Sequence, residues 1–236
     1  MKKKYLAIGF VLFMLILLLF CTYKLMNART FQLFGGLTYQ VETDEKVVAL
    51  TFDDGPTKQT DEILDMLAHY KIKATFFLIG SDIEENPEEV KQIVQAGHQV
   101  GNHTYSHERM IFKSLEFIDT EITKTDQLIK DAGYMNEIVF RPPNGKKLFG
   151  LPYYLSKQEK ETIMWNLEPD SYFSSSSEMV QYVSDQITPG SIILMHPMYD
   201  QTGEELEAIK GIIETLLNEG YSFVTVDELK KLAAKD

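Results

Sequence analysis

Five short clusters of polar and ionisable side chains in this 236-residue chain each follow an apolar segment that is typical of a β-strand. They occupy residues 53–56, 102–107, 141–145, 165–172 and 196–197. His103 and His107 lie four residues apart, so both imidazoles would project from one face of a helical turn. Two histidines and one carboxylate are sound protein ligands for a catalytic divalent metal, because they leave positions open for water and substrate.

The adjacent acids Asp53 and Asp54 extend this chemistry. The His-x-x-x-His spacing also occurs in zinc metalloproteases, but their motif needs Glu directly after the first His, where this chain has Thr104. Neighbouring side chains at the end of a strand point in different directions, so one carboxylate could bind the metal while the other accepts a proton from the attacking water. Three of these clusters alone also have a plain structural interpretation: a capped turn for the acids, exposed polar residues for the histidine pair, and a structural role for His196.

The five clusters require a scaffold that gathers strand ends, and the apolar pattern predicts one. Strands are expected near residues 47–52, 74–79, 98–101, 138–140, 162–165, 191–195 and 223–226, with helices between them. Strict alternation indicates parallel strands with helical crossovers. Seven units suit a close relative of the eight-unit barrel, whose active sites lie at the carboxyl ends of the strands. A doubly wound open sheet is the alternative, although no nucleotide-binding glycine motif follows a strand.

The pattern of the N-terminal residues predicts a membrane anchor. Residues 5–23 carry no charge and would span roughly 28 Å as a helix, about the hydrocarbon thickness of a bilayer. Three lysines precede them, which keeps the N-terminus cytoplasmic and places the rest outside the membrane. We therefore expect an anchor over 1–28, a linker over 29–45 and a catalytic domain over 46–236. The alternative is secretion after signal cleavage at Met26-Asn27-Ala28, a weak site with Met at the first small position.

Charge and cysteine content exclude other classes of protein. Acidic residues outnumber basic ones 35 to 23, which gives a net charge of -12. Five of the bases and none of the acids precede residue 30, so the remainder carries 18 bases against 35 acids, or -17. Such a surface repels phosphate backbones and makes nucleic acid a poor partner. A single Cys rules out an internal disulfide and argues against a cysteine zinc site.

Four motifs together resemble the polysaccharide deacetylase family, also called the NodB-homology domain or carbohydrate esterase family 4. They are Thr51-Phe52-Asp53-Asp54-Gly55-Pro56, the His103/His107 pair, Arg141-Pro142-Pro143 and Leu194-Met195-His196, and the resemblance covers about residues 45–230. It implies a distorted (β/α) barrel with about seven parallel strands. It also implies that Asp53 is the catalytic base, that Arg141 holds and tunes it, and that His196 is the general acid. Asp54, His103 and His107 would bind the metal, usually Zn²⁺, with Co²⁺ or another divalent ion as alternatives.

The chain departs from the family pattern in two places. Asn144 replaces the Tyr that commonly follows Arg-Pro-Pro, although its backbone N–H remains. The fourth motif commonly ends Asp-Trp, and here it offers Asp170, with Tyr172 in the aromatic position. We expect Asp170 to pair with Arg141, with Glu168 as the alternative partner. Substrate-binding positions are then Pro143, Asn144, Trp165 and Tyr172, although Trp165 fits a plain core role equally well.

The implied function is metal-dependent removal of N-acetyl groups from amino sugars of a cell-envelope polysaccharide. An anchored extracytoplasmic enzyme would meet peptidoglycan first; an exopolysaccharide or a chitin-like oligomer is the alternative. Non-haem iron oxygenases also use two His and one carboxylate, but their acid lies close to the first His on an all-β scaffold, whereas Asp54 lies 49 residues before His103. A non-catalytic wall-binding module would have lost catalytic groups. All of them are present here: Asp53, Asp54, His103, His107 and His196.

Overall fold

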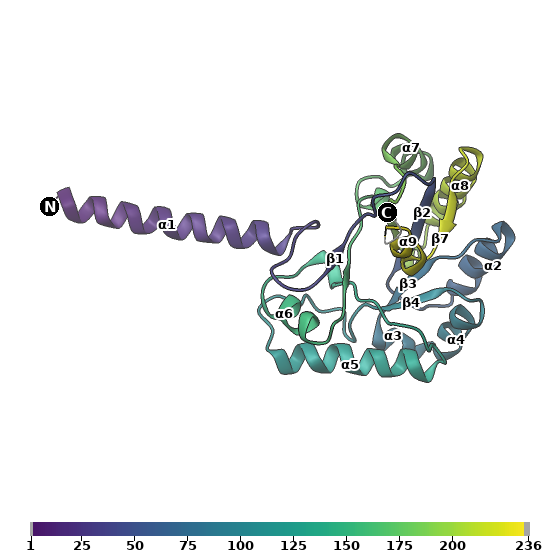
Figure 1. Ribbon diagram of the computed structural model, residues 1–236, viewed down its shortest axis with the longest axis horizontal. Coiled ribbons are helices and arrows are strands. Elements are labelled where there is room, and N and C mark those ends of the chain that lie inside the picture. Colours follow the sequence, from purple (N-terminus) through teal and green to yellow (C-terminus); the bar gives the residue numbers. More distant parts are fainter. Residues whose placement is uncertain (1, 234–236) are drawn as a thin grey trace.

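A computed structural model describes residues 2–233 as one long N-terminal helix followed by an α/β domain (Figure 1). Helix α1 (Lys2–Met26) projects away from the domain, and its length and apolar composition suffice to cross a membrane. The strands of the domain are β1 (Leu37–Thr38), β2 (Val47–Asp53), β3 (Thr75–Leu78), β4 (Gln99–Asn102), β5 (Thr162–Ile163), β6 (Ile192–Met195) and β7 (Ser222–Val224). The helices that follow α1 are α2 (Thr60–Tyr70), α3 (Gly80–Glu85), α4 (Pro87–Gln95), α5 (Leu115–Asp131), α6 (Gly150–Lys157), α7 (Ser176–Gln186), α8 (Glu204–Asn218) and α9 (Val226–Ala233).

The strands form a distorted, closed barrel, which confirms the expected fold. Strands β4, β3, β2 and β6 are parallel neighbours in that order, and β7 also pairs with β2. Single parallel bridges complete the ring. Phe140 bridges Asn102 of β4 on one side and Thr162 of β5 on the other, and Leu167, in the segment that follows β5, bridges Ile193 of β6. The segment expected as a strand over 138–140 is therefore one bridging residue. It is short because the chain turns directly afterwards into Pro142 and Pro143, and Pro has no N–H for a ladder.

Alternation along the strands separates two apolar layers. In β2, Val48, Leu50 and Phe52 pack outward against a layer that includes residues of α2, α4, α7 and α8. Val47 and Ala49 belong instead to the barrel interior, together with Phe77, Ile192 and Leu194. Because side chains alternate with period two, Thr51 and Asp53 continue the interior side of β2 toward its carboxyl end.

Each end of the barrel has a different cover. Helix α9 lies at the amino-terminal ends of the strands, where the N–H groups of Val226 and Asp227 donate to the side chains of Thr75 and Gln99. Loops surround the carboxyl-terminal ends of the strands.

Two segments differ from the expected elements. Residues 29–45, expected as a linker, contain β1, which pairs with β5, and the buried side chain of Val41. Helix α3 was not expected from the sequence, because its six residues carry too short an apolar pattern.

Candidate active site

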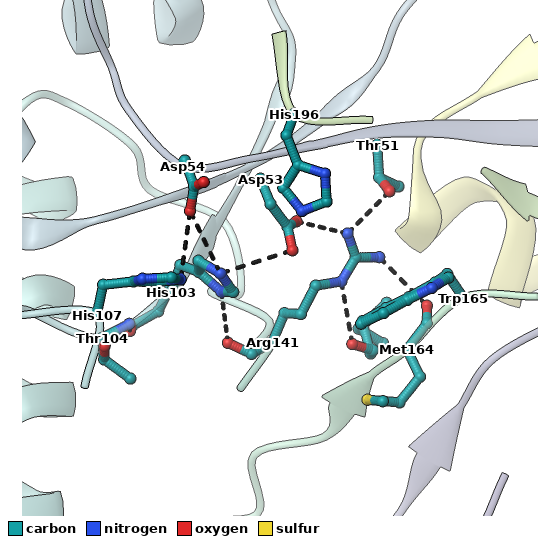
Figure 2. Close-up of polar contacts among 12 residues, drawn as sticks. Thr51, Asp53, Asp54, His103, Thr104, His107, Arg141, Met164, Trp165 and His196 are labelled. Carbon is teal, nitrogen blue, oxygen red and sulfur yellow. Dashed lines mark hydrogen bonds and ion pairs between the residues drawn. The ribbon is translucent and has the colours of Figure 1, made fainter. Parts of the chain in front are cut away.

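The five polar clusters meet at the carboxyl-terminal end of the barrel, and Figure 2 shows their central side chains. Strand β2 ends at Asp53, and Asp54 follows with a left-handed backbone (φ 72°), so the two carboxylates diverge. Gly55 also has a positive φ of 69°, and a Cβ at this position would lie 2.8 Å from Cγ of Met198. Only a residue without a side chain fits this close approach, which fixes the direction of the loop after β2.

Asp53 and Arg141 form a fully buried ion pair in the barrel interior. Nη1 of Arg141 donates to Oδ1 of Asp53 at 2.6 Å and to Oγ1 of Thr51 at 2.9 Å. Nε and Nη2 donate to the carbonyl oxygens of Ile163 and Met164, both at 3.2 Å, so each nitrogen of the buried guanidinium has an acceptor. Burial alone would raise the pKa of Asp53, but Arg141, followed by His103 and His196, lowers it below its ordinary value. Asp53 is therefore an ionised, oriented proton acceptor.

Asp54, His103 and His107 form a three-residue group that could hold a metal ion, with one ligand atom from each lying within 4.8 Å of the others. Oδ1 of Asp54 lies 3.7 Å from Nε2 of His103 and 3.4 Å from Nε2 of His107. This oxygen is buried and has no hydrogen-bond partner among residues 2–233. Nδ1 of His103 lies 2.8 Å from the carbonyl oxygen of Arg141, so Nδ1 carries the proton and Nε2 presents its lone pair. An unpartnered carboxylate oxygen facing two imidazole nitrogens fits a divalent cation.

The two histidines lie in a loop, not on the helical turn that their spacing suggested. Thr104 and His107 both have left-handed backbones, with φ of 69° and 55°. The loop is held by side chains that accept its N–H groups: Oδ1 of Asn102 accepts from Thr104, and Oε2 of Glu121 accepts from Tyr105 and Ser106. The imidazole rings lie close together, with their centroids 5.0 Å apart and their planes inclined at 44°. These loop bonds, and not helix geometry, bring both rings to the same site.

His196 lies across the site from the histidine pair and is held by Asp170. Its Nδ1 lies 2.7 Å from Oδ2 of Asp170, and the same oxygen accepts from the His196 backbone N–H at 2.9 Å. Burial would lower the pKa of His196, but the hydrogen bond and charge of Asp170 outweigh it and raise the pKa to about 9. At neutral pH the imidazole is thus protonated, with Nδ1 engaged and Nε2 free to donate.

The expected pairing of Asp170 with Arg141 is wrong. Arg141 contacts Asp53, and Asp170 contacts His196. Glu168, the alternative partner, instead accepts from Nε1 of Trp165 at 2.9 Å and from Arg29 at 2.6 Å. The correction has a geometric reason: the 3-10 turn Pro169–Ser171 carries Asp170 toward β6, whereas Arg141 extends into the barrel toward β2.

The four expected substrate-binding residues have different surroundings. Pro143 is buried, and Asn144 is exposed with a left-handed backbone (φ 53°) and its Oδ1 accepting from Nε of Arg109. Trp165 is 4% exposed and lies between two cations, with the guanidinium carbons of Arg29 and Arg141 at 4.9 and 5.3 Å from its ring centroid. Tyr172 is 62% exposed, and its ring packs against Tyr182 of α7.

The segment after α1 packs beside this site, which could not be predicted from the sequence. Arg29 forms the ion pair with Glu168, and the residues just before it contact Lys147, which lies on the loop that follows Arg141. The buried ammonium of Lys147 donates to the carbonyl oxygen of Ala28, and its backbone N–H donates to the carbonyl oxygen of Met26 at 3.3 Å. Burial lowers the pKa of Lys147 to about 8. Arg29 stands out in the sequence only as a base after the apolar run.

Glu205 is a second residue that sequence reasoning missed. Its Oε2 accepts from the backbone N–H of His196 at 3.1 Å, beside Asp170. Burial, with a smaller contribution from the charge of Asp170, raises the pKa of Glu205 to about 7. It lies in the acidic first turn of α8, where the sequence suggested only a helix start.

Comparison with known proteins gives a consistent family. A family model described as polysaccharide deacetylase matches residues 40–158. A peptidoglycan-N-acetylglucosamine deacetylase from Bacillus cereus is 33% identical over 199 residues, covering 83% of this chain and 93% of that protein. The peptidoglycan-N-acetylmuramic acid deacetylase PdaC from Bacillus subtilis is 35% identical, covering 81% of this chain, and this chain spans 40% of its length.

Solved structures agree with these relatives. A crystal structure of the Bc1960 peptidoglycan N-acetylglucosamine deacetylase, in complex with 4-naphthalen-1-yl-N-oxidanyl-benzamide, has a TM-score of 0.77 and 31% identity, covering 82% of this chain and 92% of that chain. A CE4 family pseudoenzyme from Bacillus anthracis has a TM-score of 0.76 and 31% identity, covering 84% of this chain and 69% of that chain. With half of its length matched by the family model and a relative one-third identical over nearly its whole length, this chain belongs to the polysaccharide deacetylase family.

Proposed function

We propose that this deacetylase removes N-acetyl groups from the amino sugars of peptidoglycan at the outer face of the membrane. The observation that carries the proposal is the pairing of opposite proton states at one site: Asp53 is held ionised by Arg141, and His196 is held protonated by Asp170. Amide hydrolysis needs a base for the attacking water and an acid for the departing nitrogen. The two dyads supply these groups beside the Asp54, His103 and His107 group (Figure 2).

Asp53 is the proposed general base. Its Oδ1 is occupied by Arg141, while Oδ2 lies 3.6 Å from Nε2 of His103 and therefore faces the candidate metal centre. Oδ2 is the atom that takes the proton from the attacking water. Arg141 keeps the carboxylate ionised and fixes its orientation, because it is itself held by Thr51 and two backbone carbonyls.

His196 is the proposed general acid. Its Nδ1 is committed to Asp170, so Nε2 donates the proton to the amine as the C–N bond breaks. Asp170 acts through His196 by holding the ring and stabilising its charged form. A protonated acid with a pKa of about 9 is present in full at neutral pH.

Asp54, His103 and His107 are the proposed ligands of a divalent ion, and two imidazoles with one carboxylate favour Zn²⁺. The ion, when bound, would supply Lewis-acid polarisation of the acetamido carbonyl. Co²⁺ remains an alternative, since it accepts the same nitrogen and oxygen donors.

The substrate and location follow from the relatives and from the segment after α1. Relatives named for N-acetylglucosamine and for N-acetylmuramic acid of peptidoglycan both resemble this chain, so either sugar is a candidate. An exopolysaccharide or chitin-like oligomer is the alternative polymer. Hydrogen bonds from Lys147 to the carbonyl oxygens of Met26 and Ala28 support an uncleaved anchor over secretion, because cleavage after Ala28 would detach these acceptors.

Acetate release tests the proposal. The full-length chain, in detergent, is assayed on peptidoglycan fragments and on chitin oligomers, with and without chelator, and mass spectrometry locates the deacetylated sugar. We expect chelator-sensitive release from peptidoglycan fragments, with His103→Ala as the inactive control. Faster release from chitin oligomers would reassign the substrate. A metal-loaded chain that releases no acetate from any polymer would place it with the pseudoenzyme and refute the proposal.

A further inference from the structure

The domain exposes an apolar patch next to the membrane helix, and the catalytic proposal does not use it. The patch consists of Phe31, Leu33, Phe34, Phe112, Leu115, Phe149 and Tyr153. Six of these side chains are at least 36% exposed, and Phe112 reaches 80%. Phe34 is half-buried among the aromatic rings, 5.2 Å from Phe149 and 5.7 Å from Tyr153 between centroids. A cluster of this kind on a folded domain marks an interaction surface.

Three separate segments build the patch around the start of α6. Residues 31–34 follow α1, and Cα of Ser156 in α6 would lie 3.4 Å from a Cβ built on neighbouring Gly35. Leu115 begins α5, and its Cδ2 would lie 3.9 Å from a Cβ built on Gly150. Phe149, which directly precedes α6, is stacked on Tyr153 of that helix with the ring centroids 6.3 Å apart. The gathering is thus a product of tertiary packing.

Phe112 adds an independent sign that this surface has a partner. Its backbone is left-handed, with φ of 55°, a conformation that bulky residues rarely adopt. Its ring is directed outward and does not relieve the strain by burial in the core, since it is 80% exposed. Strained residues of this kind concentrate where a protein contacts something else.

The position of the patch identifies the partner. Phe31 follows the end of α1 at Met26 by five residues, so it lies at most about 18 Å along the chain from the apolar helix. The connection is held in place, because residues 26–29 hydrogen-bond to Lys147 and Glu168 of the domain. Figure 1 shows α6 on the side of the domain from which α1 leaves. A bilayer crossed by α1 therefore lies on the same side as the patch.

We propose that the patch rests on the outer surface of the bilayer and holds the catalytic domain in one orientation on the membrane. Aromatic side chains favour the membrane–water interface, and leucine adds apolar area there. This inference rests on the anchored location proposed above, and it adds a second, interfacial contact to the spanning helix. The short, packed connection leaves the domain little freedom to turn the patch away.

Quenching by brominated lipid tests the contact in the full-length chain. Phe149→Trp and Phe112→Trp report from the patch, and Trp165, the single native tryptophan, is buried and sets the background. Met135→Trp is the matched control: Met135 is 87% exposed, but it lies beyond the far end of α5, a helix of about 25 Å. Each variant is placed in zwitterionic nanodiscs with one chain per disc, so that neither net charge nor a second copy contributes.

We expect the emission of Trp at positions 149 and 112 to fall with brominated lipid, and that at position 135 to stay unchanged. Equal quenching at all three positions, or none at the patch, overturns the proposal. Shielding of the patch tryptophans by soluble peptidoglycan fragments, without quenching by lipid, also overturns it and assigns the surface to the glycan. Acetate release is measured on the same discs. Quenching without activity counts against the proposed function alone, and activity without quenching counts against the patch alone.

Discussion

Replacing Asp170 by Asn should move the basic limb of the pH–rate profile, because Asp170 sets the charge state of His196. The hydrogen bond and the charge of Asp170 are the two largest influences that raise the pKa of His196 to about 9 from an ordinary 6.5. Asn is nearly isosteric, so the ring keeps its packing and can still bond through Nδ1. With that charge removed, the remaining charges of Asp53 and Asp54 still oppose the effect of burial, and the pKa of His196 is expected to return to about its ordinary 6.5.

The expected loss of activity depends on pH. An acid with a pKa of 9 is about nine-tenths protonated at pH 8, whereas one with a pKa of 6.5 is roughly 3% protonated, so the rate should fall roughly 30-fold there. At pH 6 both forms are mostly protonated, and the rate should fall by less than about twofold. A general acid loses its proton as the pH rises, so a lower pKa of His196 moves the basic limb of the pH–rate profile to lower pH. The acidic limb stays in place.

The assay is acetate release from peptidoglycan fragments between pH 5 and 10, with metal content measured in the same samples. Glu168→Gln is the matched control, because Glu168 lies two residues away but contacts Trp165 and Arg29 instead of His196. Its basic limb should stay in place, whatever its overall rate. If Asp170→Asn lowers the rate equally at all pH values and leaves the limb near 9, then His196 is not the acid that this limb reports.

Four further outcomes follow from the site. His103→Ala should lose bound metal and activity without unfolding, while the exposed His69→Ala keeps both; a stoichiometric metal in His103→Ala, measured by elemental analysis, would reject the metal centre. Asp53→Asn should keep its metal and lose about 10²- to 10⁴-fold in rate, whereas Asp54→Asn should lose metal and recover partly in excess metal; the reverse pattern of metal content would exchange the two roles. Arg29→Ala should lower the free energy of unfolding by about 1 kcal/mol or less, since its ion pair with Glu168 is partly exposed and screened, and chemical denaturation of the full chain measures this. The chain should fractionate with membranes at full length, and a soluble mature form beginning near residue 29 would contradict the anchor.

Much of the candidate site could be predicted because local pattern controls it. The continuous apolar run of β2 and its alternation place Thr51 and Asp53 on the interior side of the strand, and Gly55 fixes the turn that follows. Parallel strands end at the same side of a barrel, so clusters that follow separate strands had to converge there. His103, His107 and His196 meet the acids for this reason.

The partners of Arg141 and Asp170 could not be predicted in the same way. The loops that carry Arg141 and Asp170 lie at the same end of the barrel. Their separation in the sequence does not indicate which side chain either residue contacts. Arg141 reaches Asp53 because it directly follows the bridging residue Phe140 and extends into the barrel interior, where Thr51 and the carbonyl oxygens of Ile163 and Met164 accept its other donors. A single turn of 3-10 helix places the carboxylate of Asp170 beside the imidazole of His196.

The sequence by itself determined the class of fold, the residue types of the candidate metal group and the apolar N-terminal helix, since each depends on composition or on local spacing. Tertiary structure alone decided the closure of the barrel through Phe140, the packing of Arg29 and Lys147 beside the active site, and the gathering of the aromatic patch. The closure joins separate elements of the barrel, and the other two features join segments more than a hundred residues apart, as Arg29 joins Glu168. They are stabilised by burial and by contacts between distant segments, which the local periodicity of a sequence does not reveal.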